Sequence, residues 1–347
     1  MKERKFYIDF VRIIAIYFVI INHSNLVFSQ FNKLDDITWG TSAILYFIAK
    51  AGVPLFIMIS GTLLLGREED YKKVLSKIMK TLLILIIWSA LYRMFYSRSF
   101  LNFEEIILLI RDISNKPLST HFWYLYMLVG LYMMLPFIQK MVKGFKVIDY
   151  SIYLTIWLLY TSLLPFLRIF KDLTYTSYFS IPLFYGFSGY LVLGYFLANI
   201  EITKKIIYIA RLSLLASLVT MLVITYHFSS IIQKTSYVLD SNLTFPVVIL
   251  SASLFILIKH HISNININNT IFTNVLIDLS KKTFGIYLIH ILVMVMFRDG
   301  RIYHFIYDYS LNPVIGLLLY DIFLFLTSYW FITLIGKVPY VKKIVYF

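Results

Sequence analysis

Long apolar runs, separated by short polar segments, follow one another along the whole chain. A helix needs about 20 consecutive apolar residues to cross the hydrocarbon core of a bilayer. Runs of about this length predict transmembrane helices at residues 9–28, 41–65, 78–96, 121–139, 148–166, 179–199, 206–228, 243–259, 282–298 and 313–336. The pattern therefore predicts an all-α fold, a polytopic membrane helix bundle of about ten transmembrane helices.

Composition supports a bilayer rather than an aqueous environment. Hydrophobic residues make up 60% of the chain, charged residues only 14%, and the mean hydropathy is +0.78. Soluble domains are about half apolar and about a quarter charged, so this chain has too little polar surface to cover a soluble fold. We expect residues 1–347 to form a single integral-membrane domain with no separate soluble domain. The chain has no cysteine, which excludes disulfides and thiolate metal sites.

The positive charge of the chain falls in short clusters between the apolar runs. The net charge is +14, and basic clusters such as those at 72–73, 204–205 and 342–343 lie in alternate loops. The loops between them carry fewer Lys and Arg. This distribution is typical of cytoplasmic loops that face anionic lipid headgroups, and not of a surface for nucleic acid. It predicts that both termini lie on the cytoplasmic side of the membrane.

The first predicted helix carries the most informative polar residues, because ionisable groups within a span are costly and commonly functional. Arg12 and His23 are eleven positions apart, which is about 1100° of rotation, within about 20° of three full turns. Both side chains therefore project from one face, about 16 Å apart along the axis. Arg12 lies near the predicted cytoplasmic end, where Asp9, one turn earlier, can pair with it. Two other interpretations remain open: Arg12 as a snorkelling anchor and His23 as an interhelical hydrogen-bonding group.

Other spans contain further candidates. In the second span Pro54 predicts a bend, and Gly52, Ser60 and Gly61 allow close approach of a neighbouring helix. The remaining polar candidates lie in later spans: His121 with Trp123 at the external end of the fourth, Arg93 in the third and His290 in the middle of the ninth. For Trp123 an interfacial position, and for His290 a packing role, are the alternative interpretations.

Five segments, in order along the chain, resemble the acyltransferase-3 family of integral membrane acyltransferases. Arg12 and His23 match its R-x10-H signature, and His121 with Trp123 matches its H-x-W-[FY] segment. The other matches are a second-helix motif at 53–61, a glycine/aromatic helix at 185–195 and a G-I-Y-x-x-H pattern that ends at His290. They cover nearly the whole chain, which is similar to short single-domain members of the enterobacterial common antigen O-acetyltransferase type.

The resemblance implies an O-acetyltransferase in the bacterial plasma (inner) membrane. The donor is acetyl-CoA, used as a co-substrate, with no tightly bound cofactor and no metal. The acceptor is a hydroxyl of a surface glycan or of a lipid-linked sugar, membrane lipids surround the protein, and no nucleic acid is bound. The oligomeric state stays open.

The resemblance also suggests roles for the candidates. Arg12, oriented by Asp9 and helped by Arg67, is expected to hold the phosphates of CoA, because a guanidinium offers them paired donors. Where the family has an arginine pair after the second helix, this chain has Arg67 followed by lysines. His23 is expected to act as the general base or as a covalent acyl carrier. The residues expected to contact the acceptor are His121, Trp123, Arg93, Ser60 and His290.

A function from another class also fits a polar face within a helix bundle. A transporter or flippase for a lipid-linked saccharide needs polar groups across the membrane as well. The sequence lacks a clear half-to-half symmetry of interrupted helices, which is common in secondary transporters. Acyl transfer is the favoured prediction, and a transporter is the alternative.

Overall fold

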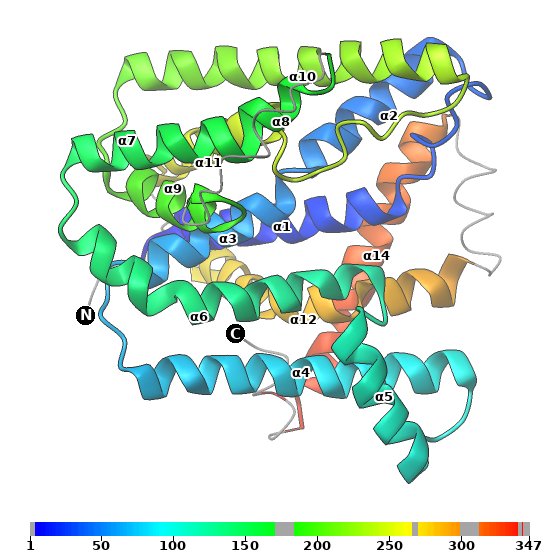
Figure 1. Cartoon of the computed structure of the whole chain (residues 1–347). Coiled ribbons are helices and arrows are strands. Elements are labelled where there is room, and N and C mark those ends of the chain that lie inside the picture. The colour runs from blue at the N-terminus through cyan, green and yellow to red at the C-terminus, as the bar shows by residue number, and fades with distance from the viewer. Residues whose placement is uncertain (1–3, 171–183, 266–269, 299–311, 339–341, 343–347) are drawn as a thin grey trace. The chain divides into compact units, whose positions relative to one another are not determined.

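The described part of the chain is helical throughout. The computed structural model describes residues 4–170, 184–265, 270–298, 312–338 and 342, and no β-strand occurs among them (Figure 1). The helices are α1 (Phe6–Ser24), α2 (Asp36–Ala49), α3 (Gly52–Leu64), α4 (Tyr71–Ser97), α5 (Phe103–Asn115), η1 (Thr120–Phe122), α6 (Trp123–Lys143), α7 (Val147–Trp157), η2 (Leu158–Leu163), α8 (Leu164–Leu167), α9 (Ser188–Asn199), α10 (Lys204–Ile232), α11 (Phe245–Ser263), α12 (Thr270–Arg298) and α14 (Pro313–Ile335). The prediction of an all-α membrane bundle is confirmed.

Nine helical segments within the described residues are long and apolar enough to cross a membrane. They correspond to nine of the predicted spans. The remaining span, 179–199, lies partly outside the described residues, and its described part is α9. One boundary differs clearly: α12 begins at Thr270 rather than near 282, because helix continues through a segment whose polar residues favoured a loop assignment.

The second predicted span is interrupted, as Pro54 indicated. Helix α2 ends at Ala49, and α3 begins at Gly52. Pro54 lies in the first turn of α3, where a missing N–H costs no intrahelical hydrogen bond. The interruption places Lys50, the C-cap of α2, at the junction of the two helices.

The chain forms two compact units. The larger contains residues 1–63 and 146–347, and the smaller contains residues 64–145. In the larger unit α1 packs against α2, α11, α12 and α14, so its polar residues lie within the unit. In the smaller unit α4 packs along α6 and also contacts α5.

Two glycines bring α3 and α9 into backbone contact within the larger unit. A β-carbon added at Gly61 would overlap the carbonyl of Leu191, and one added at Gly194 would overlap the backbone of Met58. The hydroxyl of Thr62 also donates to the carbonyl of Gly194 across this contact, at 3.0 Å. The expectation that Gly61 allows close helix approach is confirmed.

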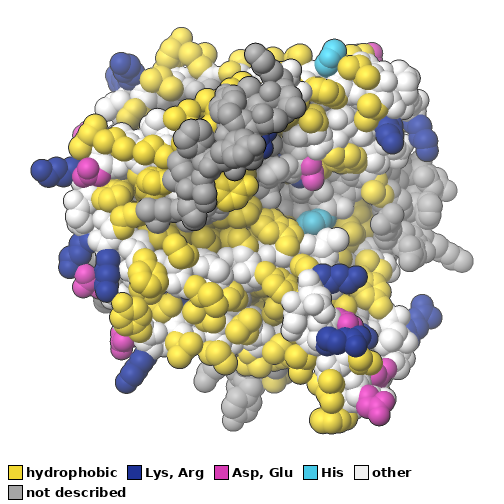
Figure 2. Space-filling model, in the orientation of Figure 1, with side chains coloured by type: hydrophobic (Ala, Val, Ile, Leu, Met, Phe, Trp, Pro, Cys, Tyr) yellow, Lys and Arg dark blue, Asp and Glu magenta, His cyan; other side chains and the backbone are white. Residues whose placement is uncertain are grey.

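The outward faces of the helices are apolar, as expected for surfaces that contact lipid tails. In each unit, Lys and Arg side chains gather toward the ends of the helices, with hydrophobic side chains between them (Figure 2). Exposed apolar residues on α10 include Leu212, Leu215, Val219 and Val223. Charge at the helix ends and apolar surface between them match a bilayer-spanning protein.

Candidate active site

Two histidines from distant parts of the sequence meet inside the larger unit. His23 lies in the last turn of α1 and His290 in α12, and their ring centroids are 5.3 Å apart. His290 is buried, whereas His23 is partly exposed. The packing of α1 against α12 therefore places a partly exposed imidazole next to a buried one.

A backbone contact determines which ring nitrogen of His290 carries a proton. Its Nδ1 lies 2.6 Å from the carbonyl oxygen of Tyr287, one turn earlier in the same helix. A carbonyl oxygen only accepts, so Nδ1 is the donor. In the neutral imidazole Nε2 is then the acceptor nitrogen, and that nitrogen can take a proton during a reaction.

The carboxylate of Asp9 binds a different arginine from the one expected. Both carboxylate oxygens accept from Arg4, with Nε and Nη2 each at 2.8 Å, and Oδ1 also accepts from Ser280 of α12 at 2.6 Å. The expectation that Asp9 orients Arg12 is therefore replaced by an Arg4–Asp9 pair. Arg4 precedes α1, so its flexible side chain can reach the Asp9 carboxylate in the first helical turn. The carboxylate also lies near the positive end of the helix dipole. Arg12 itself is partly exposed on α1.

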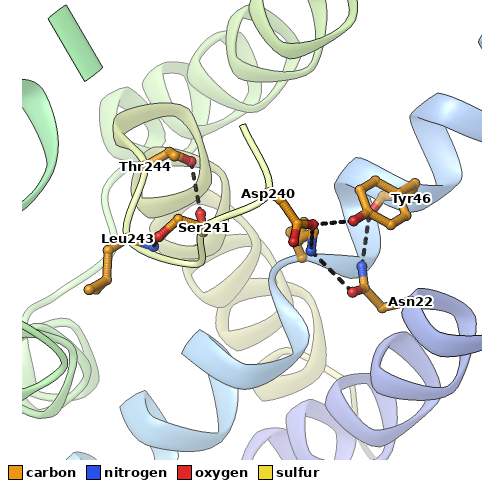
Figure 3. A network of polar contacts seen from close by, with 7 residues as sticks. Asn22, Tyr46, Asp240, Ser241, Leu243 and Thr244 are labelled. Atoms are coloured by element: carbon orange, nitrogen blue, oxygen red, sulfur yellow. Dashed lines mark hydrogen bonds and ion pairs between the residues drawn. The ribbon is translucent and has the colours of Figure 1, made fainter. Parts of the chain in front are cut away.

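A polar cluster that the sequence did not predict surrounds the junction of α2 and α3. We call Asn22, Tyr46, Lys50 and Asp240 the Asp240 cluster. Lys50 and the Tyr46 hydroxyl both donate to Oδ1 of Asp240, which lies in the loop before α11 (Figure 3). Asn22 accepts from Lys50 at 3.2 Å and donates to the backbone of Tyr46 at 3.4 Å. The cluster thus joins α1, α2 and a loop from the far half of the sequence.

The pKa of the Asp240 carboxyl depends on its neighbours in this cluster. Burial acts to raise the pKa of its carboxyl, but the charge and hydrogen bond of Lys50 act in the opposite direction. The hydrogen bond from Tyr46 and the charge of His23 also lower the pKa, and the result is a pKa below the ordinary value. Asp240 therefore carries a stable negative charge close to His23.

A second buried carboxyl lies beside the end of α1. Asp321 of α14 is fully buried and accepts from the hydroxyl of Ser24, the residue after His23. Asp321 is an ionisable residue within a membrane-spanning helix, and Ser24 is its hydrogen-bond partner. This contact ties the histidine-bearing end of α1 to α14.

The smaller unit holds three of the predicted acceptor residues. His121 is buried, with Nδ1 at 2.9 Å from the Ser119 hydroxyl and Nε2 at 3.4 Å from that of Tyr92. Arg93 forms an ion pair with Asp112 of α5 at 3.1 Å, which ties α4 to α5. Trp123 is the first residue of α6 and is partly exposed.

Two further predicted residues have simpler surroundings. Arg67 is exposed in the turn after α3. Ser60 is partly exposed, and its hydroxyl donates to the carbonyl of Phe56 in its own helix at 2.9 Å. That bond is the usual one for a serine within a helix, so it supports a structural role.

The residues missed by sequence reasoning are Tyr46 and Asp240. Lys50 was visible as a charge within an apolar run, and such a charge requires a counter-charge. Nothing local could identify Asp240 as that partner, because 190 positions separate the two residues. Within the described ranges, no group of three or more His, Asp or Glu side chains is arranged to hold a metal ion.

These features define the class: a multi-pass membrane protein with a histidine pair and charged side chains inside its larger unit. The chain belongs to the acyltransferase-3 family, since residues 5–337 match the family described as "Acyltransferase domain". The family resemblance is thereby confirmed, and the protein is a membrane acyltransferase. No curated protein and no solved structure matches the chain.

Proposed function

We propose that this protein transfers an acetyl group from acetyl-CoA to a hydroxyl of a cell-surface or lipid-linked glycan at the bacterial plasma membrane. The observation that carries the proposal is the His23–His290 pair within a chain of the acyltransferase-3 family. The similarity to short single-domain members that acetylate surface glycans supports the acceptor class.

The chemistry requires a base, because a sugar hydroxyl is a poor nucleophile at neutral pH. His23 removes the hydroxyl proton as the oxygen attacks the thioester carbonyl carbon. The carbon–sulfur bond breaks, and CoA leaves as the thiolate. The proton that His23 took from the hydroxyl then passes to the sulfur. The ring of His290 lies next to that of His23, and its acceptor nitrogen Nε2 can hold this proton before it passes to the sulfur.

A covalent route uses the same residue. His23 attacks the thioester first, and the acyl-imidazole then passes the acetyl group to the sugar hydroxyl. In that route His290 is the candidate base for the second step. Rapid-quench trapping of acetylated protein distinguishes the two routes.

Arg12 is proposed to bind the donor. It lies on the same helix as His23, toward the predicted cytoplasmic end, where CoA is available. A guanidinium binds phosphate through two parallel hydrogen bonds, and Arg67 in the turn after α3 is a second candidate for this contact. In place of the expected Asp9–Arg12 pair, Arg4 occupies the Asp9 carboxylate.

The test measures transfer of radiolabelled acetyl groups from acetyl-CoA by the purified protein in lipid nanodiscs. The acceptor is a glycan extract from cells that produce this protein. We expect His23→Ala to lower acetyl transfer by at least about a hundredfold, the usual contribution of a general base. His261→Ala is the matched control, because His261 is exposed near the end of α11. Retained transfer in His23→Ala would eliminate His23 as the base or carrier.

The donor site is tested separately by Arg12→Lys. A lysine keeps the charge but loses the paired geometry, so we expect the half-saturating acetyl-CoA concentration to rise about tenfold, equivalent to about 1.4 kcal/mol. An unchanged value contradicts phosphate binding by Arg12. If the wild-type protein transfers no acetyl group and instead moves lipid-linked saccharide across vesicles, a flippase is the function.

A further inference from the structure

The Asp240 cluster combines a buried cation with a half-exposed carboxylate. The side chain of Lys50 is only 6% exposed, whereas that of Asp240 is 50% exposed. A buried ammonium needs a fixed counter-charge, so Lys50 holds Asp240 in one position. Tyr46 holds the same oxygen from a second direction.

The contacts leave one carboxylate oxygen available for a ligand. Lys50 and Tyr46 both donate to Oδ1, and no described residue donates to Oδ2. Because the side chain is half exposed, Oδ2 can accept from a molecule outside the protein. A charged acceptor with a fixed orientation binds hydroxyl groups strongly and selectively.

An aromatic ring lies on the same loop. Tyr237 is 51% exposed, and edge-to-face contacts with Phe28 (5.7 Å between ring centroids) and Tyr46 (6.4 Å) hold its ring. The C–H face of a sugar packs on such a ring while its hydroxyls bond to nearby polar groups. Tyr237 and Asp240 therefore offer the two kinds of contact by which proteins recognise sugars.

The cluster is adjacent to the histidine pair. Asn22, which accepts from Lys50, directly precedes His23 in α1. The charge of His23 also contributes to the electrostatics of Asp240. A sugar bound at Asp240 would thus lie beside the end of α1 that carries the proposed base.

We propose that Asp240 and Tyr237 form the acceptor subsite, which binds a neutral or amino-bearing sugar and directs one of its hydroxyls to His23. Lys50, Tyr46 and Asn22 are positioning residues that fix the Asp240 carboxylate. The exposed negative charge disfavours phosphate at this subsite, so a sugar ring and not the phosphate of a lipid carrier occupies it. This inference rests on the proposed acetyl transfer.

The experiment compares Asp240→Asn with the wild type in the nanodisc assay, with the glycan extract of producing cells as the probe. We expect the half-saturating extract concentration to rise about tenfold, as for loss of one charge-assisted hydrogen bond. The half-saturating acetyl-CoA concentration should not change. If Asp240 had only a structural role, the half-saturating concentrations of acetyl-CoA and of the glycan extract would change together.

Two further comparisons complete the test. Asp35→Asn changes a loop carboxylate that caps α2 through the Thr38 N–H, and it should leave the half-saturating glycan concentration unchanged.

Tyr237→Phe keeps the ring and should resemble the wild type. Tyr237→Ala removes the ring and should raise the half-saturating glycan concentration. The alanine variant tests the subsite even if Asp240→Asn fails to fold.

The outcomes separate the two proposals. Acetyl transfer by the wild type, with unchanged glycan saturation in both Asp240→Asn and Tyr237→Ala, overturns the acceptor subsite but leaves the proposed function in place. If the wild type consumes no acetyl-CoA with the glycan extract, the proposed function fails, and the acceptor subsite fails with it.

Discussion

At the scale of single residues, the ring of His290 is more constrained than that of its partner His23. It is buried, and its Nδ1 is committed to the carbonyl of Tyr287. That contact orients the ring and presents Nε2 as the acceptor nitrogen. The sequence predicted that His290 contacts the acceptor, with packing as the alternative, and the structure adds its contact with the ring of His23.

His290→Gln tests the function of this ring. Glutamine keeps a polar side chain but cannot take up a proton near neutral pH, so we expect acetyl transfer to fall at least about tenfold. His227→Gln, at an exposed position on α10, is the control and should retain full activity. Gel-filtration elution and thermal melting in detergent check that the fold is intact. Full activity of His290→Gln would reduce His290 to a packing residue.

The low pKa of Asp240 predicts a pH-dependent contribution to stability. A carboxyl whose pKa is lower in the folded state stabilises the protein above its unfolded pKa of about 3.9, and the stabilisation is lost as the pH falls through the folded value. The difference in melting temperature between wild type and Asp240→Asn should therefore be present at neutral pH and shrink below about pH 4. Differential scanning fluorimetry in detergent measures it, and a difference that is independent of pH would contradict the assignment.

Residue-scale reasoning succeeded where the signal was local and failed where it depended on a partner. The position of Arg12 and His23 on one helix follows from the apolar run that contains both. The partner of Asp9 does not, because Arg4 and Arg12 are both within reach of its carboxylate by sequence. The structure selects Arg4, and Ser280 from α12 completes the contact.

At the scale of helices, the interruption between α2 and α3 has two consequences. It places the ammonium of Lys50 at a point where the loop carrying Asp240 can reach it. The separate helix α3 that follows it packs Gly61 against α9. Proline and glycine in the sequence predicted the interruption and the close approach, but not the helix that Gly61 contacts.

Gly61→Ala tests that contact. The added methyl group would overlap the backbone of Leu191, and backbone cannot move aside as a flexible side chain can. We expect a loss of about 1–3 kcal/mol, the usual cost of overpacking. Gly130→Ala is the control, since no atom lies within 4 Å of a β-carbon at that exposed position in α6. Melting temperatures in detergent measure both, and equal values would show that α3 and α9 are not in close contact.

At the scale of the whole molecule, the charge distribution predicts the orientation in the membrane. Lys205 and Lys234 are exposed residues near the two ends of α10, the first in a predicted cytoplasmic loop and the second in a predicted external one. If α10 crosses the bilayer, these two positions lie on opposite sides.

Single cysteines at these positions test the orientation without background, because the chain has none of its own. In intact cells a membrane-impermeant maleimide should label Lys234→Cys but not Lys205→Cys. After permeabilisation both should be labelled. The reverse pattern would invert the predicted topology and place the termini outside.

The sequence alone determined the membrane class, most of the helices, the family and the positions of Arg12 and His23. These follow from the length of apolar runs and from spacing along one helix, which are local properties of a chain in a bilayer. The tertiary structure decided which polar groups meet: His23 with His290, Lys50 with Asp240, and Asp9 with Arg4. When the partner comes from a distant helix or loop, the pairing depends on how the helices pack. When several partners lie within reach, it depends on the direction of the side chains. The order of residues along the chain specifies neither the packing nor the direction.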